Sequence, residues 1–333
     1  KTQFIHVDGL ASKNQKDAVT VDLNKVDLGF VLHNILKLKG ISFGGIVTGK
    51  ATLLSLLKQP VFEANLFVKG AQINHTVIGD AQLFSTWDRP NQQMYITGDF
   101  VNDKNLPIAN AKGVFVPKTD SLDFIIDAHK LNVQFITPYF ESVVQNVKGL
   151  ATGKIRMFGP SKILGFEGNA FIEEGQGSVK MLKTTYFFND TIRLKRKTIE
   201  FRNITIYDQE HNPASLNALM KHNGSFQHMN YDVRVKASNM LALNTHAEDN
   251  EYFFGKAYAN GTVHIYGDEK VANIDVNAVS QPQTKCYIQM GGASKVSDNN
   301  FINFVNKKVI VPKDDVVAKP QSNFNVKVNL QID

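Results

Sequence analysis

The chain has 333 residues, with a single cysteine, Cys286, and a single tryptophan. One cysteine excludes an intrachain disulfide and a zinc site built from cysteines. No run of 18 apolar residues occurs, so we predict no segment that crosses a membrane as a helix. The first residues also lack the apolar stretch of a secretory signal. We therefore expect a segment of a longer protein, with any anchor or targeting signal upstream.

Motifs with catalytic or cofactor-binding chemistry are missing as well. The sequence has no glycine-rich phosphate loop, no His-Glu-x-x-His and no dinucleotide fingerprint, and it lacks the spacing of a nucleophile elbow. His222 and His228 flank Gly224, but zinc would need a further ligand, so we predict a polar turn there. These absences predict that the chain is not an enzyme and holds neither a cofactor nor a metal.

Positive charge is only mildly in excess, and the net charge is +6. A basic excess favours anionic partners such as lipid headgroups, lipopolysaccharide or nucleic acid. The one marked cluster comprises Arg193, Lys195, Arg196 and Lys197. It fits a solvated turn or strand edge, or contacts to anionic headgroups. Because proteins that bind nucleic acid usually show broader basic surfaces, we predict no nucleic-acid partner.

What the sequence does contain is alternation of apolar and polar residues. Apolar residues make up 43 % of the chain, which includes 23 phenylalanines. The pattern is strict in residues 324–332 and 272–278, and it recurs in the triplets Leu131/Val133/Phe135 and Val26/Leu28/Phe30. Successive side chains of a strand point to opposite faces, so each segment predicts one apolar and one polar face. Strands of this kind belong to antiparallel sheets, and we predict an all-β fold.

An internal repeat of about a hundred residues is the second pattern. Gly49, Gly153 and Gly261 each close a short motif of small residues that precedes a strand, and they are 104 and 108 residues apart. Glycines repeated within strands suggest bulges or a close approach of neighbouring backbones. We predict one continuous body built from approximate repeats at 20–125, 126–230 and 231–333. Within the last repeat, 311–322 reads as a mobile loop.

Helices are predicted to be few and short, and to serve as plugs or corners between strands. The candidates are Val31–Leu38, Pro138–Val147, Pro213–Lys221 and Ser297–Val305.

The C-terminal third resembles a known family. The segments that carry the resemblance are Asp208–Gly224, Phe254–Gly267, Asn273–Ala278, Thr284–Ile288 and Val296–Val305. They look like the TamB translocation and assembly module, within the AsmA-like superfamily. Gln289 departs from the family pattern, where proline is expected in a turn. By this comparison the chain is a fragment without the N-terminal anchor and the extreme C-terminal strands.

The resemblance implies a fold and a role. Family members form a long sheet that curls into a taco-like groove with an apolar lining. They are anchored in the inner membrane and cross the periplasm. They are implicated in moving phospholipid to the outer membrane and in assembling outer-membrane proteins. Their partner is an Omp85-class barrel, reached through a C-terminal part that is not in this chain. No catalytic residues carry over.

We therefore expect the apolar strand faces to line a groove that holds phospholipid acyl chains. The predicted lining residues are Leu131, Val133, Phe135, Ile155, Met157, Ile204, Ile206, Val263, Ile265, Ile274, Val276, Phe324, Val326, Val328 and Leu330. Alternation alone favours two sheets packed as a closed sandwich, the commoner way to bury such faces. The repeat and the resemblance reverse that preference. A different function also fits the same strands, namely a scaffold that captures strands of unfolded outer-membrane proteins at a sheet edge.

Overall fold

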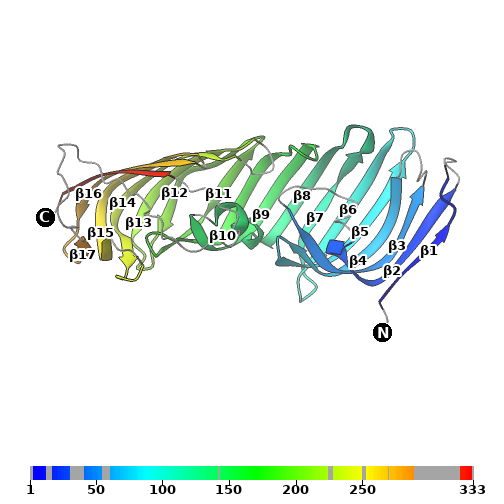
Figure 1. Ribbon diagram of the computed structural model, residues 1–333, viewed down its shortest axis with the longest axis horizontal. Coiled ribbons are helices and arrows are strands. Elements are labelled where there is room, and N and C mark those ends of the chain that lie inside the picture. The colour runs from blue at the N-terminus through cyan, green and yellow to red at the C-terminus, as the bar shows by residue number, and fades with distance from the viewer. Residues whose placement is uncertain are drawn as a thin grey trace, which may run out of the picture. The chain divides into compact units, whose positions relative to one another are not determined.

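The computed structural model describes residues 3–12, 17–30, 41–54, 61–141, 143–223, 228–249, 253–268, 270–288 and 323–331. Most of them lie in strands. The described helices are the single turns η1 (Pro117–Thr119), η2 (Gln134–Ile136) and α2 (Thr137–Phe140), together with the helical residues Leu28–Phe30. The predicted all-β, antiparallel fold with a few short helices is therefore confirmed (Figure 1). The strands are β1 (Phe4–Gly9), β2 (Ala18–Asp27), β3 (Phe43–Leu54), β4 (Val61–Ile73), β5 (Thr76–Asp88), β6 (Gln93–Val101), β7 (Pro107–Val116), β8 (Ser121–Asn132), β9 (Val144–Pro160), β10 (Gly165–Val179), β11 (Thr184–Lys195), β12 (Thr198–Tyr207), β13 (Pro213–Lys221), β14 (Asn230–Thr245), β15 (Phe253–Gly267), β16 (Val271–Ser280), β17 (Lys285–Ile288) and β18 (Asn323–Gln331).

The chain divides into two compact units. The first comprises Lys1–Glu141, Val147–Gly175 and Thr191–Lys197, and the second comprises Ser142–Asn146, Gln176–Asp190 and Thr198–Asp333. Among the described residues, no helix has the length and apolar character that a membrane crossing requires.

The first unit is a meander in which each strand from β1 to β9 pairs antiparallel with the next. Its core forms on one face of β2–β5, where Val47 and Val68 are fully buried and Leu23, Val26 and Ala81 surround them. Val47 lies opposite Val68, and Val68 lies opposite Ala81, so the apolar side chains stack across three strands. Cross-strand pairs of this kind stabilise a sheet.

A turn and a helix that lie far apart in this unit's meander touch each other. Asn74, in the turn between β4 and β5, donates from its side-chain amide to the carbonyl oxygen of Phe135 in η2 at 3.0 Å. The same amide lies 3.4 Å from the hydroxyl of Tyr139 in α2. Three intervening strands separate β5 from β9 in the pairing order. The contact therefore links two connecting segments that are not neighbours in the pairing order.

The same β-bulge recurs in β2, β8 and β14. Lys25, Lys130 and Asn239 each adopt a positive φ, of 57°, 58° and 50°, where the register of β2, β8 and β14 shifts. In each case the backbone N–H of the bulged residue donates to a side-chain oxygen on the next strand. The acceptors are Thr48 Oγ1 at 3.1 Å, Thr152 Oγ1 at 3.1 Å and Asn260 Oδ1 at 2.5 Å.

The glycines of the predicted repeat follow these acceptors directly. Gly49, Gly153 and Gly261 have φ of +149°, +154° and +157°, a backbone region that side chains disfavour. A Cβ at Gly153 would lie 2.2 Å from the carbonyl oxygen of Asn169. The close approach of neighbouring backbones that the repeated glycines suggested is therefore present at each of them.

In the second unit, β12 to β16 form a second antiparallel meander. The edge of β15 is shared, because Ala259–Gly267 pairs with β16 while Phe253–Lys256 pairs with β17. One pairing departs from the expected antiparallel order, since β18 runs parallel to β16.

Two predicted helices are wrong. Pro213–Lys221 is the strand β13, and of Pro138–Val147 only the residues up to Phe140 are helical, because β9 begins at Val144. Two expected strand segments also end early. Leu28–Phe30 is helical, and Val133 and Phe135 lie beyond the end of β8. Val31–Leu38, Ser297–Val305 and the predicted loop 311–322 lie outside the described residues.

Candidate functional site

One face of β13–β16 in the second unit carries aliphatic side chains in two straight rows across the strands. Both rows follow from the register, in which residues directly opposite one another share a face. The members are half-buried except for Ala218, which is buried. We call these eight residues the aliphatic face: Leu216, Val235, Val263 and Val276 in one row, and Ala218, Val233, Ile265 and Ile274 in the other.

The opposite face of the same strands is polar. Thr262 lies between Lys236 and Asn277, and His264 lies between Arg234 and Asp275. Asp232 completes the group, since Arg234 Nε is 3.1 Å from Asp232 Oδ1. The hydrogen bond from Arg234 holds the pKa of Asp232 below its usual value. The sheet therefore has one side suited to hydrocarbon and one suited to water.

Toward β12 the apolar side of the sheet is covered by the chain's own aromatic residues. Ile204 is completely buried and Ile206 nearly so, in a cluster with Met240. Phe201 packs against this cluster and meets Phe188 edge to face, with ring centroids 6.4 Å apart. Ile204 and Ile206 were predicted to line a surface, but here they form a packed core beside the aliphatic face.

Of the other predicted lining residues in the second unit, Val263, Ile265, Ile274 and Val276 are brought together on the aliphatic face. For the predicted residues of β18 the backbone register places Val326 opposite Ile274 and Val328 opposite Val276. Phe324 and Leu330 lie opposite Ala272 and Ala278, at either end of the same stretch.

In the first unit, the predicted residues divide. Ile155 and Met157 of β9 lie opposite Ile126 and Phe124 of β8 and form a second half-buried apolar surface. Leu131 lies opposite Ala151, past the bulge at Lys130. Val133 and Phe135 do not join this surface as strand residues. Val133 is buried and precedes η2, and Phe135 lies within η2.

The basic cluster lies where β11 turns into β12. Arg193 and Lys195 belong to β11, and Arg196 and Lys197 form the exposed turn that follows. The guanidinium carbon of Arg196 lies 5.8 Å from the ring centroid of Phe158, and that of Arg156 lies 4.7 Å from the same ring. Such cation–π contacts hold the two guanidinium groups at one place.

Sequence reasoning missed half of the aliphatic face, namely Leu216, Val233 and Val235 together with Ala218. The alternation of Val233 and Val235 with Asp232, Arg234 and Lys236 was a usable signal. The alternation around Leu216 and Ala218 was harder to recognise, because the residues of this segment favour a helix.

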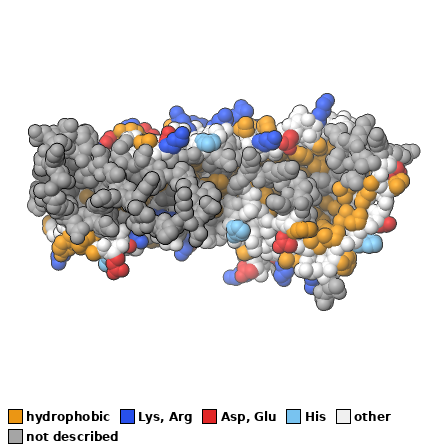
Figure 2. Space-filling view, in the orientation of Figure 1, with side chains coloured by type: hydrophobic (Ala, Val, Ile, Leu, Met, Phe, Trp, Pro, Cys, Tyr) orange, Lys and Arg blue, Asp and Glu red, His pale blue; other side chains and the backbone are white. Residues whose placement is uncertain are grey.

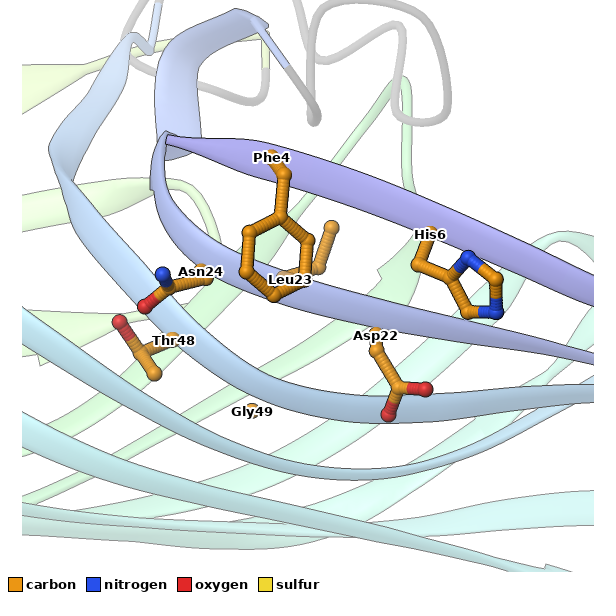
Figure 3. A pocket seen from close by; sticks show the side chains of 7 residues that line it. All are labelled: Phe4, His6, Asp22, Leu23, Asn24, Thr48 and Gly49. Carbon is orange, nitrogen blue, oxygen red and sulfur yellow. The ribbon is translucent and has the colours of Figure 1, made fainter. Parts of the chain in front are cut away.

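The described residues also form a shallow depression of about 600 Å³. Figure 3 shows Phe4 and His6 of β1 on one side, Asp22, Leu23 and Asn24 of β2, and Thr48 and Gly49 of β3. Phe4, Ile5 and Val7 of β1 are each about half exposed. Figure 2 shows hydrophobic side chains at the surface toward the end of the view where β1 lies in Figure 1. Within the described ranges, no three His, Cys, Asp or Glu side chains gather as a metal site would require.

Comparison with known proteins identifies the C-terminal part of the chain. A family model described as the TamB C-terminal domain matches residues 202–333, which contain β13–β18 and the whole aliphatic face. No curated protein and no solved structure matches the chain. The match confirms the resemblance seen in the sequence. Residues 202–333 therefore carry a TamB C-terminal domain, the domain of a family that serves transport and assembly in outer-membrane biogenesis.

Proposed function

We propose that this chain is a periplasmic segment of a protein that conducts phospholipid between the inner and outer membranes, with acyl chains lying on the aliphatic face. The observation that carries the proposal is the pair of aligned aliphatic rows across four strands, with a polar face behind them. Each methylene group that leaves water for this surface gains about 0.8 kcal/mol. The rows run across the strands, so an acyl chain laid along them stays in contact with aliphatic side chains from β13 to β16.

Native mass spectrometry of the chain purified without detergent, with lipid extraction of the same sample, tests this proposal. We expect bound phospholipid in the unmodified chain and its loss in Val263→Asp, because a carboxylate on the aliphatic face repels hydrocarbon. Thr262→Asp is the matched control, since it introduces the same charge one residue away on the polar face beside Lys236. Val263→Ser tests the same position with a smaller perturbation of folding.

Two results would overturn the conduit. One is a lipid-free mass that stays lipid-free after incubation with liposomes. The other is equal lipid content in Val263→Asp and Thr262→Asp, with both variants folded by circular dichroism.

A second candidate function is a scaffold that captures strands of outer-membrane proteins. The observation in its favour is that the edge of β16 pairs over nine consecutive residues with β18, a strand from later in the chain. This function predicts binding of a synthetic alternating strand peptide by a lipid-free chain. The conduit predicts bound lipid whether or not the peptide is present.

A further inference from the structure

Three hairpin turns of the first unit lie side by side at the same end of their strands, and they carry an excess of positive charge. They are the β7–β8 turn (117–120), the β9–β10 turn (161–164) and the β11–β12 turn (196–197). Together they present four cations, Lys118, Lys162, Arg196 and Lys197, against one carboxylate, Asp120. We call these four cations the basic rim.

Hydrogen bonds and ring contacts join the turns. Ser161 donates from its backbone N–H to the carbonyl oxygen of Asp120 at 2.8 Å, and from its hydroxyl to Asp120 Oδ2 at 2.5 Å. Phe166, which follows the second turn, donates its N–H to the carbonyl oxygen of Arg196 at 3.4 Å. The contact of Arg196 with Phe158 links the third turn to the end of β9. The turns that carry the basic rim are therefore held next to one another.

Several cations on the strands of this unit are paired, whereas the lysines of the rim are not. Arg156 is 2.6 Å from Asp123, Lys154 is 3.3 Å from Asp127 and Lys130 is 2.8 Å from Glu173. For Lys118, Lys162 and Lys197, the described part of the chain shows no ion pair, and all three are exposed. The one rim carboxylate, Asp120, is already bound by Ser161. The positive charge of the rim is thus left for an external anion.

An exposed aliphatic side chain stands within the basic rim. Ile163 directly follows Lys162 and is 54 % exposed. A cluster of lysines around an exposed aliphatic residue matches the two layers of a membrane surface, phosphate above and hydrocarbon below. A soluble anion would need only the charges.

We propose that the basic rim docks on the surface of a membrane that contains anionic phospholipid, with the lysines at the phosphate groups and Ile163 at the boundary of the acyl layer. This deepens the proposed function, on which it rests only for the choice of lipid as partner. Each lysine near an anionic membrane surface strengthens binding about fivefold, so three lysines are expected to contribute on the order of 100-fold.

Vesicle flotation tests the docking surface, with vesicles of phosphatidylcholine alone and vesicles of phosphatidylcholine mixed with phosphatidylglycerol. The triple variant K118Q/K162Q/K197Q is compared with K69Q/K104Q/K112Q, which removes the same charge from exposed lysines elsewhere in the first unit. We expect the rim variant to lose roughly 100-fold in partition to the anionic vesicles, and the control to change by less than a tenth of that factor. Equal losses in the two triples, or no loss in the rim variant, would overturn the proposal.

Two further arms identify the source of the phosphate. Ile163→Ser should weaken partition to anionic vesicles without changing the binding of inorganic phosphate measured by calorimetry. Complete displacement of the chain from vesicles by inorganic phosphate at constant ionic strength would instead mark a site for free phosphate and overturn membrane docking. Lipid co-purification separates the two proposals. If the conduit proposal is wrong, no lipid co-purifies with the chain, but the chain still binds anionic vesicles. If the docking proposal is wrong, lipid still co-purifies, and K118Q/K162Q/K197Q binds vesicles as well as the unmodified chain does.

Discussion

The backbone N–H of Lys130 donates to Thr152 Oγ1 at 3.1 Å, so a side chain on β9 holds the bulge of β8 in place. We predict that Thr152→Val, which keeps the shape and removes the acceptor, lowers the free energy of unfolding by about 1 kcal/mol. Thr152→Ser keeps the hydroxyl and should have little effect. Amide hydrogen exchange at Lys130 measures the difference, and equal exchange rates in the two variants would contradict the assigned role of the hydroxyl.

The glycine that follows Thr152 gives a stronger test of the same bulge. Gly153→Ala should cost roughly 3 kcal/mol, because alanine at φ +154° is strained and its Cβ would meet the carbonyl oxygen of Asn169 at 2.2 Å. Gly70 is the control, since it also has a positive φ, of 59°, but a Cβ there meets nothing within 4 Å. Gly70→Ala should cost about 1 kcal/mol. Urea unfolding midpoints of the two variants rank these costs, and the reverse order would refute the close approach at Gly153.

Asp208 in the β12–β13 turn is completely buried and accepts four hydrogen bonds. One oxygen accepts the backbone N–H groups of Glu210 and Asn212, and the other accepts the N–H of Leu241 and the side-chain amide of Asn212. Because donors face both oxygens, Asp208→Asn places an amide against a donor whichever way it is turned. We predict a loss of about 2 kcal/mol in unfolding free energy for Asp208→Asn, and about 3 kcal/mol for Asp208→Ala.

The contribution of Asp208 should also depend on pH. Burial raises its pKa, but the hydrogen bonds from Leu241 and Asn212 outweigh burial and hold the pKa below the ordinary value of 3.8. A carboxyl group whose pKa is lowered on folding stabilises the protein above its unfolded-state pKa, and the contribution is lost as the pH falls through the folded-state pKa. The stability difference between the unmodified chain and Asp208→Asn should therefore be constant above pH 3.8 and shrink below it. Urea midpoints over this range measure it, and a constant difference at lower pH would argue against an ionised Asp208.

Two isoleucines of the second unit should respond differently to truncation. Ile204 is completely buried, so Ile204→Ala should cost about 3–4 kcal/mol in unfolding free energy. Ile265 is half-buried on the aliphatic face, so Ile265→Ala should cost about 1 kcal/mol and mainly reduce the lipid retained on purification. Thermal unfolding together with lipid extraction separates the two effects. Equal destabilisation would mean that Ile265 belongs to a closed core.

The residues of the aliphatic face show what sequence patterns can predict. The alternation in 272–278 predicts both the strand β16 and the face to which Ile274 and Val276 belong, because a strand has a fixed two-residue period. The repeated glycines at 49, 153 and 261 likewise predicted a close approach of backbones. The alternation and the glycine motif are both local patterns, and the strand face and the close backbone approach are both decided by local backbone geometry.

The failures have a physical cause in pairing between strands. Pro213–Lys221 contains alanine, leucine, methionine and lysine, which favour helices in isolation. Its pairing with β12 on one side and β14 on the other overrides that preference. The burial of Ile204 beneath the aromatic residues around it could not be predicted either, because it depends on side chains from β11 that the sequence does not show to be neighbours.

The spacing of the rows on the aliphatic face has a consequence for how fast a lipid acyl chain bound there would move. Its rows repeat at the strand spacing of about 4.8 Å, which does not match the spacing of methylene groups along an acyl chain. A displaced acyl chain would lose contact with one valine as it gained contact with the next, so the energy would vary little along the path. In the proposed conduit such a surface would give low friction, and the rate of lipid passage would then be set at the two ends of the aliphatic face.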